Sequence, residues 1–177
     1  TISITAETGS TVKVYSNGDL LGTATEGGDA GGGNSNFSFT VANSDALPDG
    51  NYRITATATD GVGNVSADAT VQDIVIDSTV PTASVITAIS TDTGTVGDKI
   101  TSDTTLTISG TAEAGASVRV SLGGTQVGSA VTADANGAWT YDHTGSSLSP
   151  GNHSFTAVAT DTASNVSSAT SPAYVVK

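Results

Sequence analysis

The chain has 177 residues, with 21 Gly, no Cys, no Met and one Trp. Its 17 acidic residues outnumber 5 basic ones, and the formal net charge of −12 excludes nucleic-acid binding through clustered Lys and Arg. The sequence also lacks basic segments that dock on anionic membranes and apolar stretches long enough for membrane insertion. No charged and apolar leader opens it, so we expect an internal piece of a larger protein or a mature pair of domains.

The absence of Cys excludes a disulfide framework and thiol chemistry. Small domains without disulfides often need another stabiliser, and a bound metal ion is the obvious candidate.

The first half of the chain shows the two-residue periodicity of β-strands. In residues 52–60, apolar side chains alternate with Arg53, Thr55, Thr57 and Thr59, which predicts a strand with one buried face. A glycine-rich insertion, residues 27–33, precedes this strand. The half ends at residues 75–77, and residues 78–81 form a very short connector.

The second half begins with an expected strand near residues 82–90 and a long acidic loop, residues 91–104. Short segments rich in Thr, Val and aromatic residues predict further strands at residues 107–110, 117–122, 138–142 and 173–176. Phe155, Ala157 and Ala159 are expected to point inward along one more strand. Turn signals separate these segments, and no window shows a helical stripe, so we predict an all-β protein.

Two segments of the first half recur in the second. Residues 5–14 match residues 111–120 at six of ten positions, and residues 47–66 match residues 148–167 at eleven of twenty. A repeat of about 100 residues is a whole domain, because solenoid units are far shorter. We therefore predict two tandem Greek-key β-sandwiches of the immunoglobulin type, residues 1–77 and 78–177, the first lacking its opening strand.

A series of motifs in chain order resembles the bacterial immunoglobulin-like repeats of giant type I-secreted surface adhesins. The motifs are Ile76-Asp77-Ser-Thr-Val-Pro81, Asp92-x-Gly94-x-x-Gly97, Thr132-Ala-Asp-Ala-Asn-Gly137-x-Trp139 and Ala159-Thr-Asp161-x-x-x-Asn165. The resemblance covers nearly all of the second domain and most of the first. It implies a monomeric, non-enzymatic extender module on the bacterial cell surface, which projects a distal binding domain for attachment or biofilm formation. Its partners would be neighbouring repeats of the same chain, with Ca²⁺ stiffening each junction.

The acidic residues point to calcium independently. Tracing an immunoglobulin-type sandwich brings the loops at Glu113 and Asp161 to the end of the second domain that receives the linker, where Asp77 lies. Ca²⁺ takes 6–8 oxygen ligands, and carboxylates from separate segments suit it well. We predict that Asp77, Glu113 and Asp161 form one calcium site, to which Asp45 and Asp49 lend further oxygens.

Two more sets of acids are candidate metal ligands. Glu7 and Asp60 repeat the Glu113 and Asp161 pair at the other end of the first domain, and the acidic loop carries Asp92, Asp98 and Asp103. For any single Asp, the alternative is a solvated carboxylate or a turn former. Asn64 and Asn165 are expected to bridge the backbone of their own loops.

The segment from Asp134 to Gly137 resembles the start of an EF-hand, but the ligand positions five and twelve hold Ala138 and Gly145. A type I′ hairpin turn at Asn136-Gly137 explains it better.

Nothing in the sequence points to an enzyme, because neither a His-Glu-x-x-His run nor a Gly-x-Ser-x-Gly elbow is present. Trp139 and Tyr141 share one strand face, as do Phe37 and Phe39, and we interpret all four as core residues. A sugar-stacking surface is the alternative interpretation. A carbohydrate- or surface-binding module and an accessory domain of a secreted hydrolase therefore stay open as alternative functions.

Overall fold

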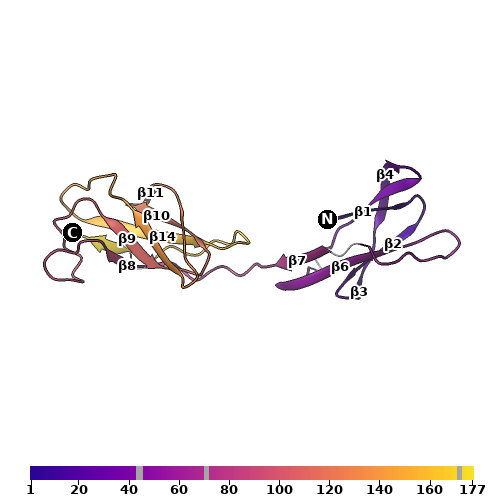
Figure 1. The fold of residues 1–177 in the computed structure, drawn as a ribbon, viewed down its shortest axis with the longest axis horizontal. Helices are drawn as coiled ribbons and strands as arrows, with labels where there is room; N and C mark the ends of the chain where they lie inside the picture. The colour runs from indigo at the N-terminus through magenta and orange to yellow at the C-terminus, as the bar shows by residue number, and fades with distance from the viewer. Residues whose placement is uncertain (43–45, 70–71, 171–172) are drawn as a thin grey trace. The chain divides into compact units, whose positions relative to one another are not determined.

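The computed structural model describes residues 1–42, 46–69, 72–170 and 173–177 (Figure 1). The chain divides into two compact units, Thr1–Asp77 (unit 1) and Ser78–Lys177 (unit 2). The described residues form strands and turns but no helix, which confirms the all-β prediction. In those ranges no helix has the length and apolar character needed to cross a bilayer.

Unit 1 consists of two antiparallel sheets. Its strands are β1 (Ile2–Glu7), β2 (Thr11–Ser16), β3 (Asp19–Thr23), β4 (Thr25–Gly31), β5 (Asn34–Phe39), β6 (Gly50–Thr59) and β7 (Gln72–Ile76). One sheet has the order β1-β5-β4 and the other has the order β3-β2-β6-β7.

Unit 2 repeats most of this plan with an additional first strand, but among its described residues no strand pairs with β13 as β4 pairs with β5. Its strands are β8 (Val85–Ile89), β9 (Thr107–Thr111), β10 (Ser117–Leu122), β11 (Thr125–Gln126), β12 (Val131–Thr132), β13 (Ala138–Asp142), β14 (His153–Thr160) and β15 (Tyr174–Val176). The order is β13-β9-β8 in one sheet and β11-β10-β14-β15 in the other, where β12 also pairs with β10.

Each unit buries its own hydrophobic core, built from the alternating faces of its strands. In β6, Ile54 and Ala56 are buried, and in β14 the predicted inward residues Phe155, Ala157 and Ala159 are fully buried. Burying a side chain such as Phe155 contributes about 1.5–3 kcal/mol. The strand periodicity that the sequence predicts for both segments is confirmed.

The first strand of unit 2 has no counterpart among the described residues of unit 1. In unit 2, β8 pairs with β9 in an antiparallel ladder. In unit 1, β1 occupies the place of β9, and in the described part of the unit it pairs with β5 alone. The described residues of unit 1 agree in this respect with the prediction that the first domain lacks its opening strand.

The glycine-rich insertion of unit 1 forms a strand, which the sequence analysis did not foresee. Residues of β4 pair with β5, with register shifts between Glu26 and Asp29 and between Asp29 and Gly31. Every residue of β4 is exposed, so no alternation of apolar side chains marks it in the sequence.

The two Asn-Gly pairs make different turns. Asn17 and Gly18, between β2 and β3, both have positive φ, at 51° and 95°, as a type I′ turn requires. Of the second pair only Gly137 has positive φ, at 81°, and its N–H donates to the carbonyl of Asp134 at 2.9 Å. The type I′ prediction for Asn136-Gly137 is therefore wrong. The geometry is that of a type I turn with Gly137 in a bulge, which the Asp134 side chain favours by accepting from the N–H groups of Asn136 and Ala138.

Candidate calcium-binding loops

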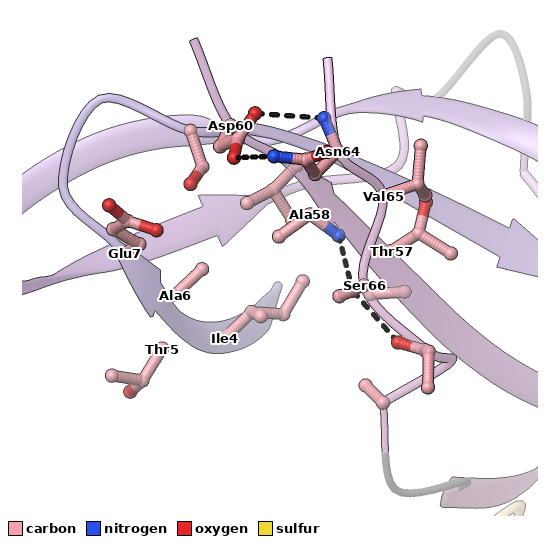
Figure 2. Close-up of a pocket in the computed structure, with 15 residues that line it drawn as sticks. Ile4, Thr5, Ala6, Glu7, Thr57, Ala58, Asp60, Asn64, Val65 and Ser66 are labelled. Carbon is pink, nitrogen blue, oxygen red and sulfur yellow. Dashed lines mark hydrogen bonds between the residues drawn. The ribbon is translucent and has the colours of Figure 1, made fainter. Parts of the chain in front are cut away.

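Glu7 and Asp60 lie at the same end of unit 1 because of the strand register. β1 ends at Glu7, and β2 follows after a short turn and pairs with β6, so that Thr11 lies opposite Thr59. The side chains of Glu7, Asp60 and Asn64 line one groove of about 440 Å³, as Figure 2 shows. The structure thus brings together the two acids that the sequence pairs at this end.

Asp60 is held by the loop that follows it. Its Oδ1 atom accepts from the backbone N–H groups of Val62 at 3.0 Å and Asn64 at 2.8 Å, and its Oδ2 atom accepts from the Asn64 side chain at 2.7 Å. These hydrogen bonds, chiefly those from Asn64, lower the pKa of Asp60 because they stabilise its charged form. The carboxylate therefore closes its own loop.

Asp161 repeats this arrangement in unit 2. It accepts from the backbone N–H and from the side-chain amide of Asn165, both at 2.8 Å. Burial raises the pKa of Asp161, but the hydrogen bonds from Asn165 and its neighbours outweigh burial and lower it overall. Asn64 and Asn165, which the sequence analysis expected to bridge the backbone of their own loops, each donate from the side chain to the Asp carboxylate of the same loop.

Glu113 takes the place of Glu7 in the second repeat. The β10–β14 ladder pairs Ser117 with Thr160, as the β2–β6 ladder pairs Thr11 with Thr59, so Glu113 and Asp161 flank equivalent ladders. The side chain of Glu113 is exposed. Asp77, the last residue of unit 1, and Asp49 are exposed as well, whereas Asp45 lies outside the described residues.

The acids of the loop after β8 each accept from their own loop. Asp92 accepts from the N–H of Gly97 at 2.7 Å, and Asp98 accepts from the N–H of Ile100 at 2.9 Å. Asp103 accepts from the backbone and hydroxyl of Thr105, which lower its pKa. The other oxygen of Asp92 is buried without a hydrogen-bond partner in the described residues.

Metal-ion coordination by these acids stays a prediction. Within the described ranges, no three acidic or histidine side chains lie together in a group that could hold a metal ion. The paired acids offer carboxylate oxygens, which are hard ligands of the kind that Ca²⁺ takes. Two carboxylates do not make a full set, so backbone oxygens, water or a further acid would have to complete it.

The sequence analysis missed how regularly Asp serves as a turn cap in this chain. Asp29, Asp134 and Asp142 each accept from an N–H two residues later, as do Asp98 and Asp103. The signal is an Asp in a loop or near a strand end, two residues before Gly, Asn, Thr or Ile, where its carboxylate reaches the local backbone.

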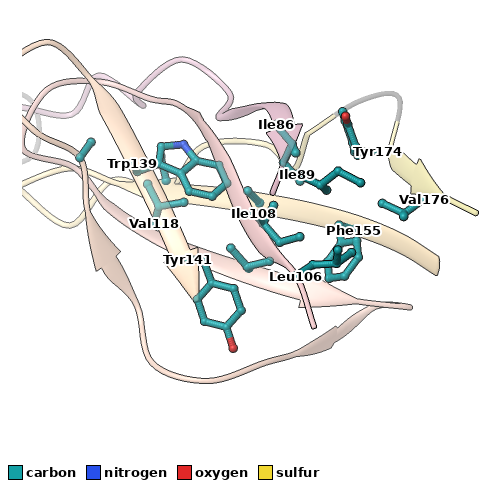
Figure 3. Close-up of a cluster of buried hydrophobic side chains, with 14 of the residues drawn as sticks. Ile86, Ile89, Leu106, Ile108, Val118, Trp139, Tyr141, Phe155, Tyr174 and Val176 are labelled. Atoms are coloured by element: carbon teal, nitrogen blue, oxygen red, sulfur yellow. The ribbon is translucent and has the colours of Figure 1, made fainter. Parts of the chain in front are cut away.

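The large aromatic residues belong to the core rather than to a binding surface. Trp139 is 3% exposed and Tyr141 is 7% exposed, and both lie among the apolar side chains of unit 2 (Figure 3). Phe37 is buried and Phe39 packs on the core of unit 1. The core interpretation of these four residues is confirmed, so these four rings do not form an exposed sugar-stacking surface.

The histidines have structural contacts. His143 is buried, with its ring centroid 6.2 Å from that of Phe155. The Nε2 atom of His153 lies 2.6 Å from the carbonyl oxygen of Ser149. Tyr52, its counterpart in unit 1, donates from its hydroxyl to the equivalent carbonyl of Pro48 at 2.8 Å. The same corner of both sandwiches is thus closed by one side chain.

Two antiparallel sandwiches with a shared strand plan define the chain as a tandem pair of immunoglobulin-like domains. It matches the bacterial Ig-like domain family over residues 1–78 and 79–176, and it belongs to that family. No curated protein matches the chain.

Several solved structures are similar to the chain at low identity. The fibronectin(III)-like modules of Clostridium thermocellum CbhA match at 17% identity and a TM-score of 0.47, over 98% of this chain and 84% of that one. A 1.5-MDa bacterial ice-binding adhesin matches at 21% identity and a TM-score of 0.47, over 99% of this chain and 56% of that one. The Bacteroides ovatus glucan-utilization protein SGBP-B, solved with a mixed-linkage heptasaccharide, matches at 17% identity and a TM-score of 0.30. This match covers 99% of this chain and 42% of that one. The chain therefore spans about half of the adhesin structure and less of the glucan-binding one.

Proposed function

We propose that the chain is a structural extender module of a large bacterial cell-surface adhesin. In this role the two units separate a distal binding domain from the cell, in series with neighbouring repeats of the same polypeptide. The observation that carries the proposal is the tandem repetition of one bacterial Ig-like domain over the whole chain. A role as a spacer requires folded units that repeat, and it requires no catalytic group.

The burial of the aromatic residues supports a spacer over the carbohydrate-binding alternative. A glycan site that stacks sugar rings needs exposed aromatic faces. Trp139 and Tyr141 are buried and pack in the core of unit 2. The accessory-domain alternative depends on a catalytic domain in the same polypeptide. The proposal places the protein outside the cell, where a chain without Cys needs no reducing environment.

Calcium is the second part of the proposal. Glu7 with Asp60, and Glu113 with Asp161, would supply carboxylate oxygens at the ends of the units, with Asp77 as a further donor. Asp92, Asp98 and Asp103 form the second candidate set in unit 2. Bound Ca²⁺ would neutralise the repulsion between neighbouring carboxylates and so restrict their loops. Extracellular calcium at about 10⁻³ M is sufficient for sites of the weakest class, with dissociation constants of about 10⁻⁴–10⁻³ M.

Thermal unfolding of the 177-residue chain in calcium, in magnesium and in EGTA tests this part. Trp139 is the only Trp of the sequence, so its fluorescence reports unit 2 alone. At ten times the dissociation constant, bound Ca²⁺ adds about 1.4 kcal/mol, which raises the midpoint of unit 2 by about 6–11 °C. Small-angle scattering of the same samples measures whether calcium also stiffens the chain.

Two variants make the test specific. The double variant Asp77→Ala with Asp161→Ala should lose the calcium-dependent rise, whereas Asp19→Ala, at an exposed acid of β3, should keep it. If calcium and EGTA give the same midpoint and the same scattering profile, the calcium part of the proposal is wrong. The extender role itself is tested by the order of domains in the full-length polypeptide.

A further inference from the structure

A hollow opens at one flank of unit 2, where the outer strands of its two sheets come together. β13 is the last strand of one sheet, and β11 is the last strand of the other. The hollow, of about 490 Å³, is lined by residues 126–128 next to β11 and by Tyr141, His143 and Ser146 in and after β13. Sites for small molecules have volumes of about 300–1,000 Å³, so the hollow is large enough for one.

Two side chains that line the hollow are buried, yet their polar atoms are unpaired. Tyr141 is 7% exposed and His143 is 8% exposed. Neither the hydroxyl of Tyr141 nor a ring nitrogen of His143 makes a hydrogen bond within the described residues. Among those residues, only Asp92 and Trp139 have a fully enclosed polar atom without a partner. The polar atoms of Tyr141 and His143 therefore open to the hollow, and Figure 3 shows the Tyr141 hydroxyl directed away from the other labelled side chains.

The fold holds both side chains in place. The N–H of His143 donates to the carbonyl of Leu106 at 2.9 Å, and the carbonyl of His143 accepts from the N–H of Ser146 at 3.0 Å. The hydroxyl of Tyr141 lies against Gly128, where a Cβ atom would collide with it. The polar atoms are thus fixed before any ligand arrives, which reduces the entropy that binding costs.

The repeat shows that the sandwich does not require polar atoms at this corner. In unit 1, Phe39 and Val41 take the places of Tyr141 and His143, because the β1–β5 and β9–β13 ladders have the same register. The ring of Phe39 also packs against a glycine, as the ring of Tyr141 does. Unit 1 builds the corner without a hydroxyl or an imidazole, so packing alone does not explain these two groups in unit 2.

The lining of the hollow suits an uncharged ligand that carries hydroxyl groups. No Lys or Arg is among the lining residues, so the hollow offers nothing to an anion. The carboxylate of Asp142 accepts from the hydroxyl and the N–H of Thr144 at 2.6 and 2.8 Å. Val127 is the only aliphatic side chain of the lining apart from small residues. A phenol hydroxyl, an uncharged imidazole and a carboxamide can each donate and accept, as the hydroxyl groups of a sugar require.

We propose that this hollow binds one neutral sugar residue through its hydroxyl groups. The Tyr141 hydroxyl, the His143 ring and the Gln126 carboxamide supply the hydrogen bonds. The Nε2 atom of Gln126 donates to the carbonyl of Gly128 at 3.2 Å, which leaves the side-chain oxygen to accept from the sugar. The inference adds a ligand to the extender role and does not depend on that role.

The sugar is not stacked on an aromatic ring, because the ring of Tyr141 is buried. Binding therefore rests on a few hydrogen bonds in contact with water, each of modest net strength. We expect a dissociation constant of about 1–50 mM.

The test is an NMR titration of the ¹⁵N-labelled 177-residue chain. The methyl glycosides of glucose, galactose and mannose are added separately up to about 0.2 M, several times the expected dissociation constant. At least one of them should cause saturable shifts of the amide signals of residues 126–128 and 141–146. The ring nitrogens of His143 should shift with the same constant, and the amide of Val12 in unit 1 should not move.

Variants assign the binding to the hollow. Tyr141→Phe removes one hydroxyl and keeps the ring, and it should weaken binding about 3–10-fold. Gln126→Ala changes an exposed side chain outside the core and should weaken binding by a similar factor. Tyr174→Phe is the control, because this second buried tyrosine of unit 2 lies outside the hollow, with its ring 4.2 Å from the Nζ atom of Lys99. Fluorescence of Trp139 checks that each variant is folded.

A charged sugar tests the class of ligand. The methyl glycoside of glucuronate carries a carboxylate on the same ring, and it should bind more weakly than the glucoside because Asp142 repels it and no base lines the hollow. The proposal is overturned if none of the three neutral glycosides causes saturable shifts, or if Tyr141→Phe and Gln126→Ala bind as tightly as the original chain. Tighter binding of the glucuronate would overturn it as well, since the ligand would then be an anion.

Discussion

Gly110 lies directly opposite Trp139 in the ladder between β9 and β13, and the indole ring covers the place where a side chain at position 110 would begin. The corresponding pair in unit 1 is Ile4 opposite Phe37. Unit 2 thus pairs the largest side chain, that of Trp139, with a glycine that has no side chain. Unit 1 pairs two side chains of intermediate size, those of Ile4 and Phe37. Equivalent positions of the two ladders therefore divide side-chain volume differently between the paired strands.

This relationship predicts that Gly110→Ala strongly destabilises unit 2. A Cβ atom would collide with the indole of Trp139 and with the carbonyl of Val85, which belongs to the backbone and cannot move alone. We expect a loss of about 3 kcal/mol, at the upper end for overpacking, measured by urea unfolding with Trp139 fluorescence. Gly145→Ala is the control, since nothing lies within 4 Å of its Cβ position. Equal stability of the two variants would contradict the prediction.

The separate cores predict independent responses to core mutations. Phe155→Ala removes a fully buried ring from unit 2 and should cost that unit about 3–5 kcal/mol. The amide signals of unit 1, such as those of Val12 and Val14, should keep their chemical shifts, because these side chains pack in another core. Two-dimensional NMR combined with Trp139 fluorescence checks both expectations. Joint loss of both sets of native signals would show that the units fold as one.

The strands were predictable where burial alternates along the chain. In β14, Phe155, Ala157 and Ala159 point inward and the intervening residues do not, so a period of two is visible in the sequence. In β4 every residue is exposed. The strand pairs with β5 through its backbone, so the sequence shows no alternation of apolar and polar side chains there. Backbone hydrogen bonds hold such a strand, and they are indifferent to side-chain type.

The partners of the acidic side chains were less predictable than their positions. The repeat correctly paired Glu7 with Asp60, because strand register carries both to one groove. It did not show that Asp60 and Asp161 bond the Asn four residues later. That contact depends on the local loop conformation, with Ser164 in the left-handed region at φ 77°, which spacing alone does not specify.

The corner formed by Tyr52 predicts a measurable hydrogen bond. Tyr52→Phe removes the hydroxyl that donates to the carbonyl of Pro48, and it should destabilise unit 1 by about 1 kcal/mol. Circular dichroism and NMR report this change, and Trp139 fluorescence should stay constant because it reports unit 2. Tyr15→Phe is the control, since the Tyr15 hydroxyl makes no hydrogen bond within the described residues. Equal effects of the two substitutions would assign the loss to something other than this hydrogen bond.

The Asp–Asn loops predict that both units lose stability in acid. Hydrogen bonds from Asn64 and Asn165 lower the pKa of Asp60 and Asp161 in the folded chain, so folding favours their charged forms. This contribution is fully present above the unfolded pKa of about 3.9 and is lost as the pH falls through the lower folded values. Thermal midpoints should be measured in EGTA between pH 7 and pH 2. The contribution of Asp60 and Asp161 to these midpoints should be constant down to about pH 4 and should fall at lower pH.

Variants assign this acid-dependent loss to the loops. Asn64→Ala removes the side-chain donor to Asp60 and should raise the carboxylate pKa, followed by NMR of the side-chain carboxyl carbon. Asn165→Ala should do the same for Asp161 in unit 2, where Trp139 fluorescence gives the midpoint. Each variant should show a shallower decline in stability below pH 4, because less of the pKa difference between folded and unfolded chains is left. Unchanged carboxylate pKa values in both variants would mean that the backbone N–H groups alone hold these charges.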